Sequence, residues 1–363
     1  MGQQPPVPDA KKNTSLQEAI ERGLAYLHEH QYPNGEFCAY ISGDDAMQGW
    51  CQPDSTIFPT ALIASCLLHL KDRPGVEELL GPAADFLRAQ MARGGTWNHF
   101  TNGHPLHSLC PMDADDTACV GHFLSARGVS FPRDQNTALL MRNRRSDGLF
   151  YTWFSFHRRL RPFFGKHHLA LRLRALKNPV KTLLFWQKME CGPDDVDTVV
   201  NANVLHYLGS GPATGPIVAH LVRVLAEGRE GDCDKWYRNP FTVYYFIARA
   251  CAAGLVPAAG VASTIYTRIL AKAAPDGRLG DTVLDTALAM CALMDLDEGG
   301  ELLEKAAGFL LDNQEENGSW PRWRLYYGGP KKLTGYGSEE LSTAFCLEAL
   351  SRYASEMWRY SLL

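Results

Sequence analysis

The feature that most constrains the fold of this 363-residue sequence is a repeat found near both of its ends. Each copy has a basic residue, then an aromatic-Leu pair, Gln four residues later, Gly four residues after that, and an aromatic residue two further on. The full copies occupy 22–37 and 305–320, a looser copy occupies 86–97, and fainter copies end at 147–150 and 276–279. Helices commonly stop at a glycine followed by a turn. Each copy therefore predicts a helix that ends shortly before its glycine.

A second kind of helix is predicted after each of these turns. Six segments open with Asp, Asn, Ser or Thr, which cap helices by accepting backbone N–H bonds, and they continue with apolar side chains on nearly all faces. A helix that is apolar all round is buried, whereas the amphipathic segments 15–31 and 301–314 suit an outer layer. We therefore predict an all-α fold, a single (α/α)6 barrel of six inner and about six outer helices. The inner helices are expected to start near 55–60, 113–117, 194–198, 239–242, 281–286 and 338–343.

The domain layout follows from this repeat and from the charge distribution. Residues 1–14 are polar and contain proline, so we expect a flexible N-terminal tail, and 15–363 would form one barrel domain. The segment 148–189 interrupts the barrel with nine Lys or Arg residues, many aromatic residues and no acid. Because the net formal charge of the whole chain is −4, the residues outside this segment carry a formal charge of −13. Such a basic aromatic insertion suits peripheral contact with a membrane, an anionic headgroup, or simply a solvated face.

The composition indicates where in the cell the protein is expected. No apolar run is long enough to span a bilayer, and the N-terminus has no apolar core of a secretion signal. Ten cysteines are scattered without a CxxC pair, which is typical of reduced thiols in a cytoplasmic protein. We expect a cytoplasmic protein, with membrane association through 148–189 as an addition. A net charge of −4 gives no reason to expect nucleic acid as a partner.

Three aspartates lie within four residues at the start of one predicted inner helix: Asp113, Asp115 and Asp116. One aspartate would be enough to cap that helix and to complement its dipole. Three neighbouring acids repel one another, so the cluster indicates a function. An isolated Asp has a pKa of about 4, and burial together with nearby carboxylates raises it. This cluster could therefore hold a carboxylic acid that stays protonated near neutral pH.

The segment 113–118, Asp-Ala-Asp-Asp-Thr-Ala, resembles the DxDDTA motif of squalene–hopene cyclases and class II diterpene cyclases, and the Gln-to-Trp repeat resembles their QW repeat. Those relatives usually have two or three helical domains, and this chain has room for one barrel. It most resembles the monodomain class II terpene cyclases that convert prenylated aromatic acids into meroterpenoids. The resemblance implies that Asp115 protonates a terminal alkene or epoxide of a linear prenyl chain and starts a cationic polycyclisation, while Asp113 and Asp116 tune its acidity.

The resemblance also implies a partner that orients the acid. In squalene–hopene cyclases this partner is a His in a DVTAHVLE-like helix start. The corresponding stretch here, 199–205, places Asn203 at that position, with Asn201 as the alternative. An Asn resembles the diterpene cyclases and points away from squalene as the substrate.

Carbocations are stabilised by aromatic faces, each contributing roughly 0.5 to 2 kcal/mol. Aromatic residues near the predicted inner-helix starts and their preceding turns are candidates for lining the substrate pocket, and a core or capping role is the alternative for each. The repeat aromatics Phe37 and Trp320 are expected to be structural, and no base for the final deprotonation can be assigned. The candidates are Trp50, Trp97, Phe100, Trp153, Trp236, Tyr237, Tyr244, Trp323 and Tyr336.

The sequence motifs also bear on alternative substrates and on other classes of protein. A polyprenyl diphosphate, cyclised to a bicyclic diphosphate, is the alternative substrate and would call for Mg²⁺, whereas the prenylated acid needs no cofactor. A non-catalytic lipid-binding barrel and a glycosidase are more remote alternatives. A prenyltransferase β-subunit is disfavoured because there is no Asp-x-Cys and the last histidine is His220, and a class I terpene synthase because there is no DDxxD motif. The run Asp194, Asp195 and Asp197 is expected to cap a helix and line a polar mouth, with Mg²⁺ binding as its alternative.

Overall fold

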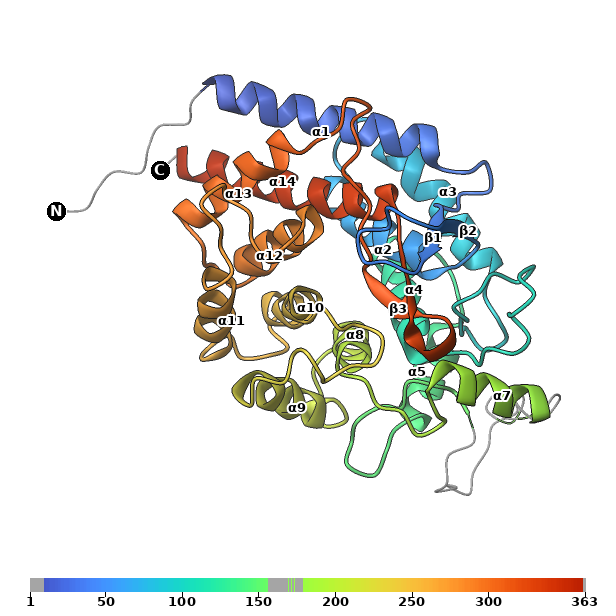
Figure 1. Cartoon of the computed structure of the whole chain (residues 1–363). Coiled ribbons are helices and arrows are strands. Elements are labelled where there is room, and N and C mark those ends of the chain that lie inside the picture. Colours follow the sequence, from blue (N-terminus) through green and yellow to red (C-terminus); the bar gives the residue numbers. More distant parts are fainter. Residues whose placement is uncertain (1–9, 156–168, 170, 172, 174–178, 362–363) are drawn as a thin grey trace.

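Helices form most of the computed structural model, which describes residues 10–155, 169, 171, 173 and 179–361. Within these residues, six helices form an inner layer in which each helix packs against the next. The last of them packs against the first, so the contacts close a ring (Figure 1). In ring order the inner helices are α2 (Phe58–Leu67), α4 (Ala114–Ala126), α8 (Thr198–Leu208), α10 (Pro240–Ala252), α12 (Val283–Asp295) and α14 (Glu339–Ser361).

The outer helices pack between neighbouring members of this ring. For example, α3 contacts α2 and α4, and α13 contacts α12 and α14. Burial separates the two layers: α12 is buried on every face, whereas α9 buries only one stripe, as a surface helix does. The outer helices are α1 (Ala10–His30), α3 (Val76–Ala89), α5 (Arg133–Arg142), α9 (Gly215–Ala226), α11 (Val261–Leu270) and α13 (Glu301–Asp312), beside α7 (Pro179–Met189) and two short 3-10 helices, η1 (Leu68–Leu70) and η2 (Pro330–Lys332).

The inner helices begin where their capping residues predict. In α4 and α12, Asp113 and Thr282 accept N–H bonds from the first turn. The N-terminal boundary differs: α1 already begins at Ala10, so residues 10–14 belong to this helix and not to a tail. No Pro or Gly follows Pro8 in this stretch to stop the helix from extending. The remaining part of the expected tail, residues 1–9, lies outside the described residues.

A small antiparallel sheet departs from the all-α prediction. Its strands are β1 (Ala39–Ser42), β2 (Cys51–Asp54), β3 (Tyr326–Gly328) and β4 (Thr334–Gly337), in the order β2-β1-β4-β3. Strands of three or four residues are too short to show an alternating pattern, and β1 pairs with β4 across almost the whole chain. The sheet has a consequence for the site, because its register sets Tyr326 opposite Tyr336.

The repeat ties the outer helices to one another and to the inner ring. The Gln314 side chain donates to the carbonyl oxygens of Gly318 and of Ala19 in α1, both at 2.8 Å. The Trp320 indole donates to Leu310 O at 2.7 Å, and the Trp320 backbone N–H donates to the Thr343 hydroxyl of α14 at 3.1 Å. Trp320 and Phe37 are both fully buried in these positions, which confirms their expected structural role.

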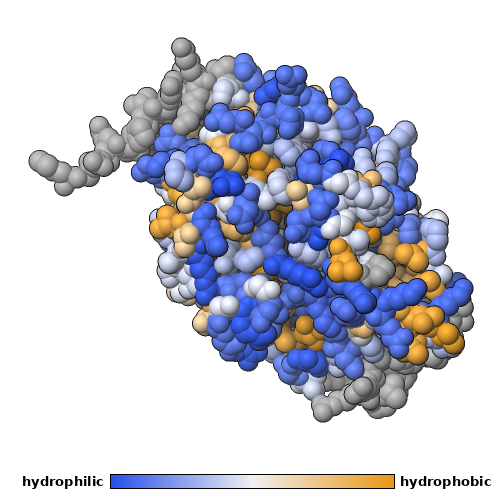
Figure 2. Space-filling model, viewed as in Figure 1, coloured by the Kyte–Doolittle hydropathy of each residue, from blue (hydrophilic) through white to orange (hydrophobic). Residues whose placement is uncertain are grey.

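The insertion 148–189 is described only in part. Most of its basic residues lie outside the described residues, but α7 and the segment 148–155 are included. On α7, Val180, Leu183 and Leu184 are exposed, and hydrophobic side chains gather at the lower right of Figure 2, where Figure 1 places this helix. None of the helices in the described ranges combines enough length and apolar character to cross a membrane.

Candidate active site

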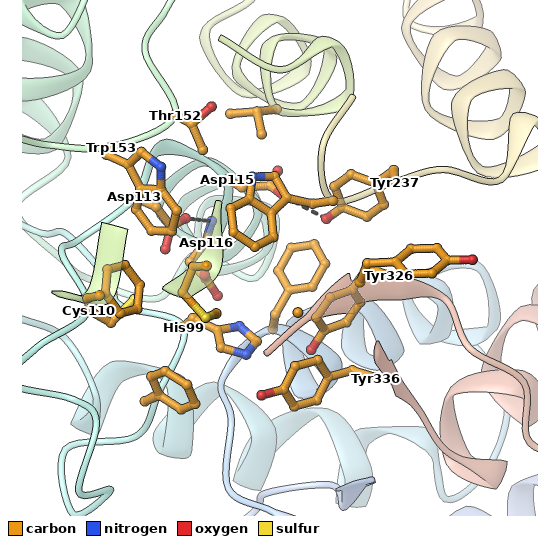
Figure 3. A pocket seen from close by; sticks show the side chains of 18 residues that line it. His99, Cys110, Asp113, Asp115, Asp116, Thr152, Trp153, Tyr237, Tyr326 and Tyr336 are labelled. Carbon is orange, nitrogen blue, oxygen red and sulfur yellow. Dashed lines mark hydrogen bonds between the residues drawn. The ribbon is translucent and has the colours of Figure 1, made fainter. Parts of the chain in front are cut away.

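A cavity with mainly aromatic walls lies beside the N-terminal turns of α2, α4 and α8 (Figure 3). The other walls come from the loop before α4, the loop before α10, α7 and the strands β3 and β4. The lining residues are Phe58, His99, Phe100, Cys110, Asp113, Asp115, Asp116, Thr152, Trp153, Phe185, Met189, Val200, Trp236, Tyr237, Tyr326, Tyr327, Gly328 and Tyr336.

The first turn of α4 brings the three aspartates to the cavity wall. Asp113 is the N-cap residue, and its Oδ1 accepts a hydrogen bond from the Asp116 N–H at 2.7 Å. Two extended segments hold this helix start: Asp113 N–H donates to Trp97 O at 3.2 Å, and Ala114 N–H donates to Thr152 O at 2.8 Å. All three carboxyl groups are buried in the wall, as the sequence predicted.

Asp115 has a hydrogen-bond donor on each of its carboxyl oxygens. The Asn203 Nδ2 of α8 donates to Oδ1 at 2.7 Å. The Tyr237 hydroxyl donates to Oδ2 at 2.6 Å (Figure 3). The amide of Asn203 is oriented in turn by Arg249 of α10, whose Nη2 donates to Asn203 Oδ1 at 2.6 Å. Because Arg249 can only donate, the NH₂ group of Asn203 must face Asp115.

The alternative partner, Asn201, does not reach the acid. Its Oδ1 accepts from Phe150 N–H at 2.8 Å, and its Nδ2 donates to Phe150 O at 3.1 Å and to Asp197 O at 2.8 Å. These bonds fasten the first residues of the insertion to α8, just as Thr343 of α14 holds Trp320. The structure therefore assigns Asn201 to the scaffold and brings Asn203 alone to Asp115.

Burial raises the pKa of all three aspartates and so favours their protonated form. It raises the pKa of Asp115 to about 6, against the opposing effect of the hydrogen bonds from Tyr237 and Asn203. Burial likewise raises the pKa of Asp113 to about 7. The pKa of Asp116 lies well above its usual value because of burial and the neighbouring Asp113 carboxylate. At pH 7 a pKa of about 6 leaves roughly a tenth of Asp115 protonated, far more than of an exposed Asp.

Two further buried acids hold the loop that carries Trp236 and Tyr237. Asp197 Oδ2 accepts from the Thr152 hydroxyl at 2.6 Å and from the Trp236 indole at 3.2 Å. Asp234 Oδ1 accepts from the backbone N–H groups of Trp236 and Tyr237 at 2.8 and 3.0 Å. Asp197 precedes α8 as predicted, yet its side chain makes no capping bond to that helix. Within the described residues, no cluster of three or more His, Cys, Asp or Glu side chains could hold a metal ion.

The structure brings five of the nine predicted aromatic residues to the cavity. Four others lie elsewhere: Trp50 is 59% exposed just before β2, and Trp97 is fully buried with its indole donating to Leu87 O at 2.7 Å, as Trp320 does in its own repeat. Tyr244 packs on Phe241 within α10, and Trp323 lies outside the cavity walls. Proximity to a helix start therefore does not decide which face of a loop or helix an aromatic residue occupies. The five at the cavity are Phe100, Trp153, Trp236, Tyr237 and Tyr336.

Several wall residues have no clear signal in the sequence. Phe58 could have been found, because it occupies the first turn of α2 as Asp115 does in α4. Tyr326 and Tyr327 lie on β3, and their position depends on a sheet that the sequence does not predict. Phe185 and Met189 of α7 reach the cavity only because α7 folds back beside it. Arg249 acts through Asn203 from the last turn of α10, a mainly apolar helix.

Comparison with known proteins finds similarity at the level of structure only. No protein-family model matches the sequence, and no curated protein does. The structure is similar to that of a protein from Actinoplanes, with 23% identity, a TM-score of 0.66, and coverage of 94% of this chain and 99% of that one. It is also similar to the type II terpene cyclase MstE from Scytonema, with 19% identity, a TM-score of 0.68, and coverage of 96% and 99%.

An MstE variant in complex with merosterolic acid A, its product, is equally similar, with 19% identity, a TM-score of 0.69, and coverage of 95% and 99%. Another MstE variant has been solved with its substrate, geranylgeranyl dihydroxybenzoate. This likeness over nearly the whole chain shows that the protein shares the fold of MstE, and it confirms a mostly helical fold of a kind used by a type II terpene cyclase.

Proposed function

We propose that this protein is a class II terpene cyclase in which Asp115 protonates a terminal alkene, or an epoxide, of a linear prenyl chain and thereby starts polycyclisation. The substrate that the site supports best is a prenylated aromatic acid, which would be converted into a meroterpenoid. The observation that carries the proposal is a buried carboxyl group with a donor on each oxygen, facing an aromatic cavity.

The proposed architecture is one (α/α)6 barrel, in which the closed ring of inner helices forms the inner wall and the six outer helices pack around it. The barrel would begin at Ala10, the first residue of α1, and continue to residue 363, with the insertion 148–189 beside the cavity. In this arrangement one end of the ring carries the cavity and the acid.

The surroundings of Asp115 suit an acid that must protonate a very weak base. Each carboxyl oxygen already accepts one hydrogen bond, so the transferable proton occupies a remaining lone pair. When the proton leaves, Asn203 Nδ2 and the Tyr237 hydroxyl are already in place to stabilise the carboxylate. Such preorganised donors stabilise developing charge without any reorganisation during the reaction. Burial raises the pKa of Asp113 and of Asp116, so both carry less negative charge than exposed carboxylates and would repel the ionised Asp115 less.

The cavity walls would stabilise the cationic intermediates. Trp153 and Trp236 meet edge to face at 5.6 Å between ring centroids, and Phe58 meets Tyr326 in the same way at 5.4 Å. Rings packed in this manner are rigid and present faces and edges to the space between them. Each ring that faces a carbocation would contribute roughly 0.5 to 2 kcal/mol.

Positive charge beside the cavity supports an anionic end on the substrate. The Lys332 Nζ donates to the carbonyl oxygens of Met189 and Glu190, both at 2.8 Å, and lies 5.1 Å from the centre of the Trp236 ring. Arg238 lies 4.8 Å from the centre of the Tyr327 ring. Because both rings line the cavity, the carboxylate of an aromatic acid could bind at this side. The aromatic-acid substrate in the MstE complex is consistent with that choice.

The test is an incubation of the purified protein with geranylgeranyl dihydroxybenzoate or geranylgeranyl diphosphate, each with and without EDTA. We expect a cyclic isomer of the dihydroxybenzoate, with unchanged mass apart from any hydration, formed equally with EDTA. Protonation of an alkene uses no cofactor. EDTA-sensitive turnover of the diphosphate alone would favour the alternative of a bicyclic diphosphate. Tight binding of both compounds without turnover would favour a lipid-binding barrel and contradict the proposal.

A peripheral membrane contact through α7 is the second part of the proposal. Val180, Leu183 and Leu184 are 69%, 57% and 46% exposed, while Phe185 of the same helix lines the cavity. Exposed apolar side chains on a helix that also carries Lys181 and Lys188 suit the surface of an anionic bilayer. A lipid substrate would enter the cavity from that surface.

This contact can be tested by flotation with vesicles that contain anionic lipid. The double change Leu183→Ser and Leu184→Ser should lower the vesicle-bound fraction, because it removes exposed apolar area from α7. Leu270→Ser is the matched control, since Leu270 is 47% exposed on α11. Equal flotation of the wild type and the double variant would rule out α7 as the contact.

A further inference from the structure

His99 contributes an imidazole to the cavity wall, where the described lining residues include no other. It lies in the segment between α3 and α4, and its backbone carbonyl accepts a hydrogen bond from Ile57 N–H at 2.9 Å. This bond fixes the backbone next to the first turn of α2. In the view of Figure 3, His99 lies below the aspartates and beside Tyr326 and Tyr336, so its ring faces the space into which Asp115 opens.

Aromatic rings surround the imidazole. The ring centroids of Phe100, Tyr336 and Tyr326 lie at 4.8, 5.0 and 5.7 Å, with interplanar angles of 74°, 73° and 89°. These edge-to-face contacts hold the His99 ring without using its nitrogens. Its side chain has no hydrogen-bond partner among the described residues, its ring nitrogens are not among the fully buried unpaired atoms, and the residue lines the cavity. The nitrogens are therefore available to a molecule in the cavity.

The electrostatic setting keeps this imidazole neutral but able to accept a proton. Burial lowers the pKa of His99 to about 4, and the nearby Asp54 carboxylate acts in the opposite direction. Asp54 itself accepts from the Tyr336 hydroxyl at 2.9 Å and pairs with His104 Nε2 at 2.9 Å. Asp54 and the surrounding rings would stabilise an imidazolium, whereas His104, when protonated, would oppose it. A carbocation is a far stronger acid than an imidazolium with this pKa, so transfer from the cation to His99 is downhill.

The other polar groups in the wall suit this step less well. Burial favours the protonated form of Asp113 and Asp116, which cannot take up a further proton, and both share the start of α4 with the acid. The phenol groups of Tyr237, Tyr326 and Tyr336 are feeble bases while they carry their protons. Asp115 is left as a carboxylate after it protonates the substrate, but it lies at the end of the chain where cyclisation starts. A separate base is needed where cyclisation ends.

We propose that His99 is the base that terminates the cyclisation. In this step an imidazole nitrogen removes a proton from the carbon next to the last cationic centre. The electron pair of the broken C–H bond forms the C=C bond, and a new N–H bond forms on the imidazole. Asp115 gives up one proton and His99 gains one, so the product is an isomer of the substrate. The inference rests on the function proposed above, and it assigns His99 a catalytic contact of its own.

The test compares the wild type with His99→Phe and His99→Gln, using geranylgeranyl dihydroxybenzoate under single-turnover conditions. Phe keeps an aromatic ring in the wall and Gln keeps polarity, and neither can take up the proton. We expect formation of the wild-type alkene to fall by roughly 100-fold in both variants, as for loss of a general base. Substrate consumption should continue and yield other alkenes or a water-trapped alcohol. The matched control is His28→Gln, at an exposed position of α1, which should leave the products unchanged.

Thermal unfolding of each variant establishes that it is folded before its products are compared. Formation of the wild-type alkene at the wild-type rate by His99→Phe would overturn the inference and leave the proposed function standing, provided that Asp115→Asn is inactive. A wild-type protein that forms no cyclic product would overturn both. Loss of substrate consumption in both folded His99 variants would also overturn the inference, because a terminating base acts after protonation.

Discussion

The two donors on Asp115 come from elements far from α4 in the sequence. Asn203 lies 88 residues away and Tyr237 lies 122 residues away. Each donor stabilises the ionised carboxylate and so strengthens the acid, while burial weakens it by raising its pKa. The balance of these two effects leaves a carboxyl group that is partly protonated at neutral pH. When this group ionises, the two hydrogen bonds that it already accepts become stronger. This combination suits a proton donor.

We predict that Asn203→Ala lowers turnover by roughly 100-fold, the usual cost of removing one donor to developing negative charge. Substrate affinity should be kept, because Asn203 lies behind Asp115 and is not a wall residue. The rate of the wild type should fall as pH rises above about 6, where Asp115 loses its proton. Removing the donor raises the pKa of Asp115, so this fall should move to higher pH in the variant.

Asn201→Ala is the matched control for that measurement. It removes bonds to the Phe150 backbone and should lower the free energy of unfolding by about 1 to 3 kcal/mol, the cost of leaving buried groups without partners. Its pH–rate profile should match the wild type. An unshifted profile in Asn203→Ala, or the same shift in both variants, would remove Asn203 from the acid's immediate surroundings.

Among the helices, the repeat works as a spacing device. The glycine of each full copy has a positive φ and lies against a carbonyl of another outer helix. A Cβ at Gly318 would be 2.4 Å from Arg22 O of α1, and one at Gly35 would be 2.0 Å from Pro82 O of α3. The Gln of the same copy bonds its own turn and the neighbouring helix. The repeat therefore sets how closely consecutive outer helices approach.

If the repeat sets the spacing of the outer helices, Gly→Ala substitutions at two glycines near one end of the chain should change the stability of the protein in opposite directions. Gly318→Ala should destabilise the protein by more than about 1 kcal/mol, because φ is +91° and the added methyl group meets the Arg22 carbonyl. Gly308→Ala, inside α13 with open space around it, should stabilise the protein by about 0.5 to 1 kcal/mol. Denaturant unfolding of both variants and the wild type measures these changes in the free energy of unfolding. The same sign for both variants would refute the spacing role of the repeat.

The sequence predicts the helices far better than it predicts the cavity. Capping residues and apolar runs are local signals, so the starts of α4 and α12 could be placed from the sequence. The cluster at Asp113 and its partner Asn203 could be found because each belongs to a motif. The sheet and the Tyr326–Tyr336 stack could not be predicted, because they depend on pairing between distant short segments. His99 carries no motif, and only its aromatic surroundings in the folded chain distinguish it.

At the scale of the whole molecule, the chemistry is concentrated at one end of the ring of inner helices. The first turns of α2, α4 and α8, the loop before α10 and the strands β3 and β4 all contribute to one cavity. The ring buries the apolar inner helices and leaves the acid at its mouth. Lys332 and Arg238 lie beside the same cavity, and α7 flanks it with exposed apolar side chains. The arrangement is consistent with the proposal that lipid entry, binding of an anionic end and protonation take place at one end of the ring.

In the proposed mechanism, the reaction starts when the Asp115 carboxyl group protonates the substrate. The most direct test of this step is the single-turnover rate of cyclisation of geranylgeranyl dihydroxybenzoate by Asp115→Asn and by the wild type, with substrate binding measured in parallel. Asn has nearly the same shape but no acidic proton, so we predict at least a roughly 100-fold loss of rate with affinity largely kept. A folded Asp115→Asn variant that cyclises the substrate as fast as the wild type would contradict the account.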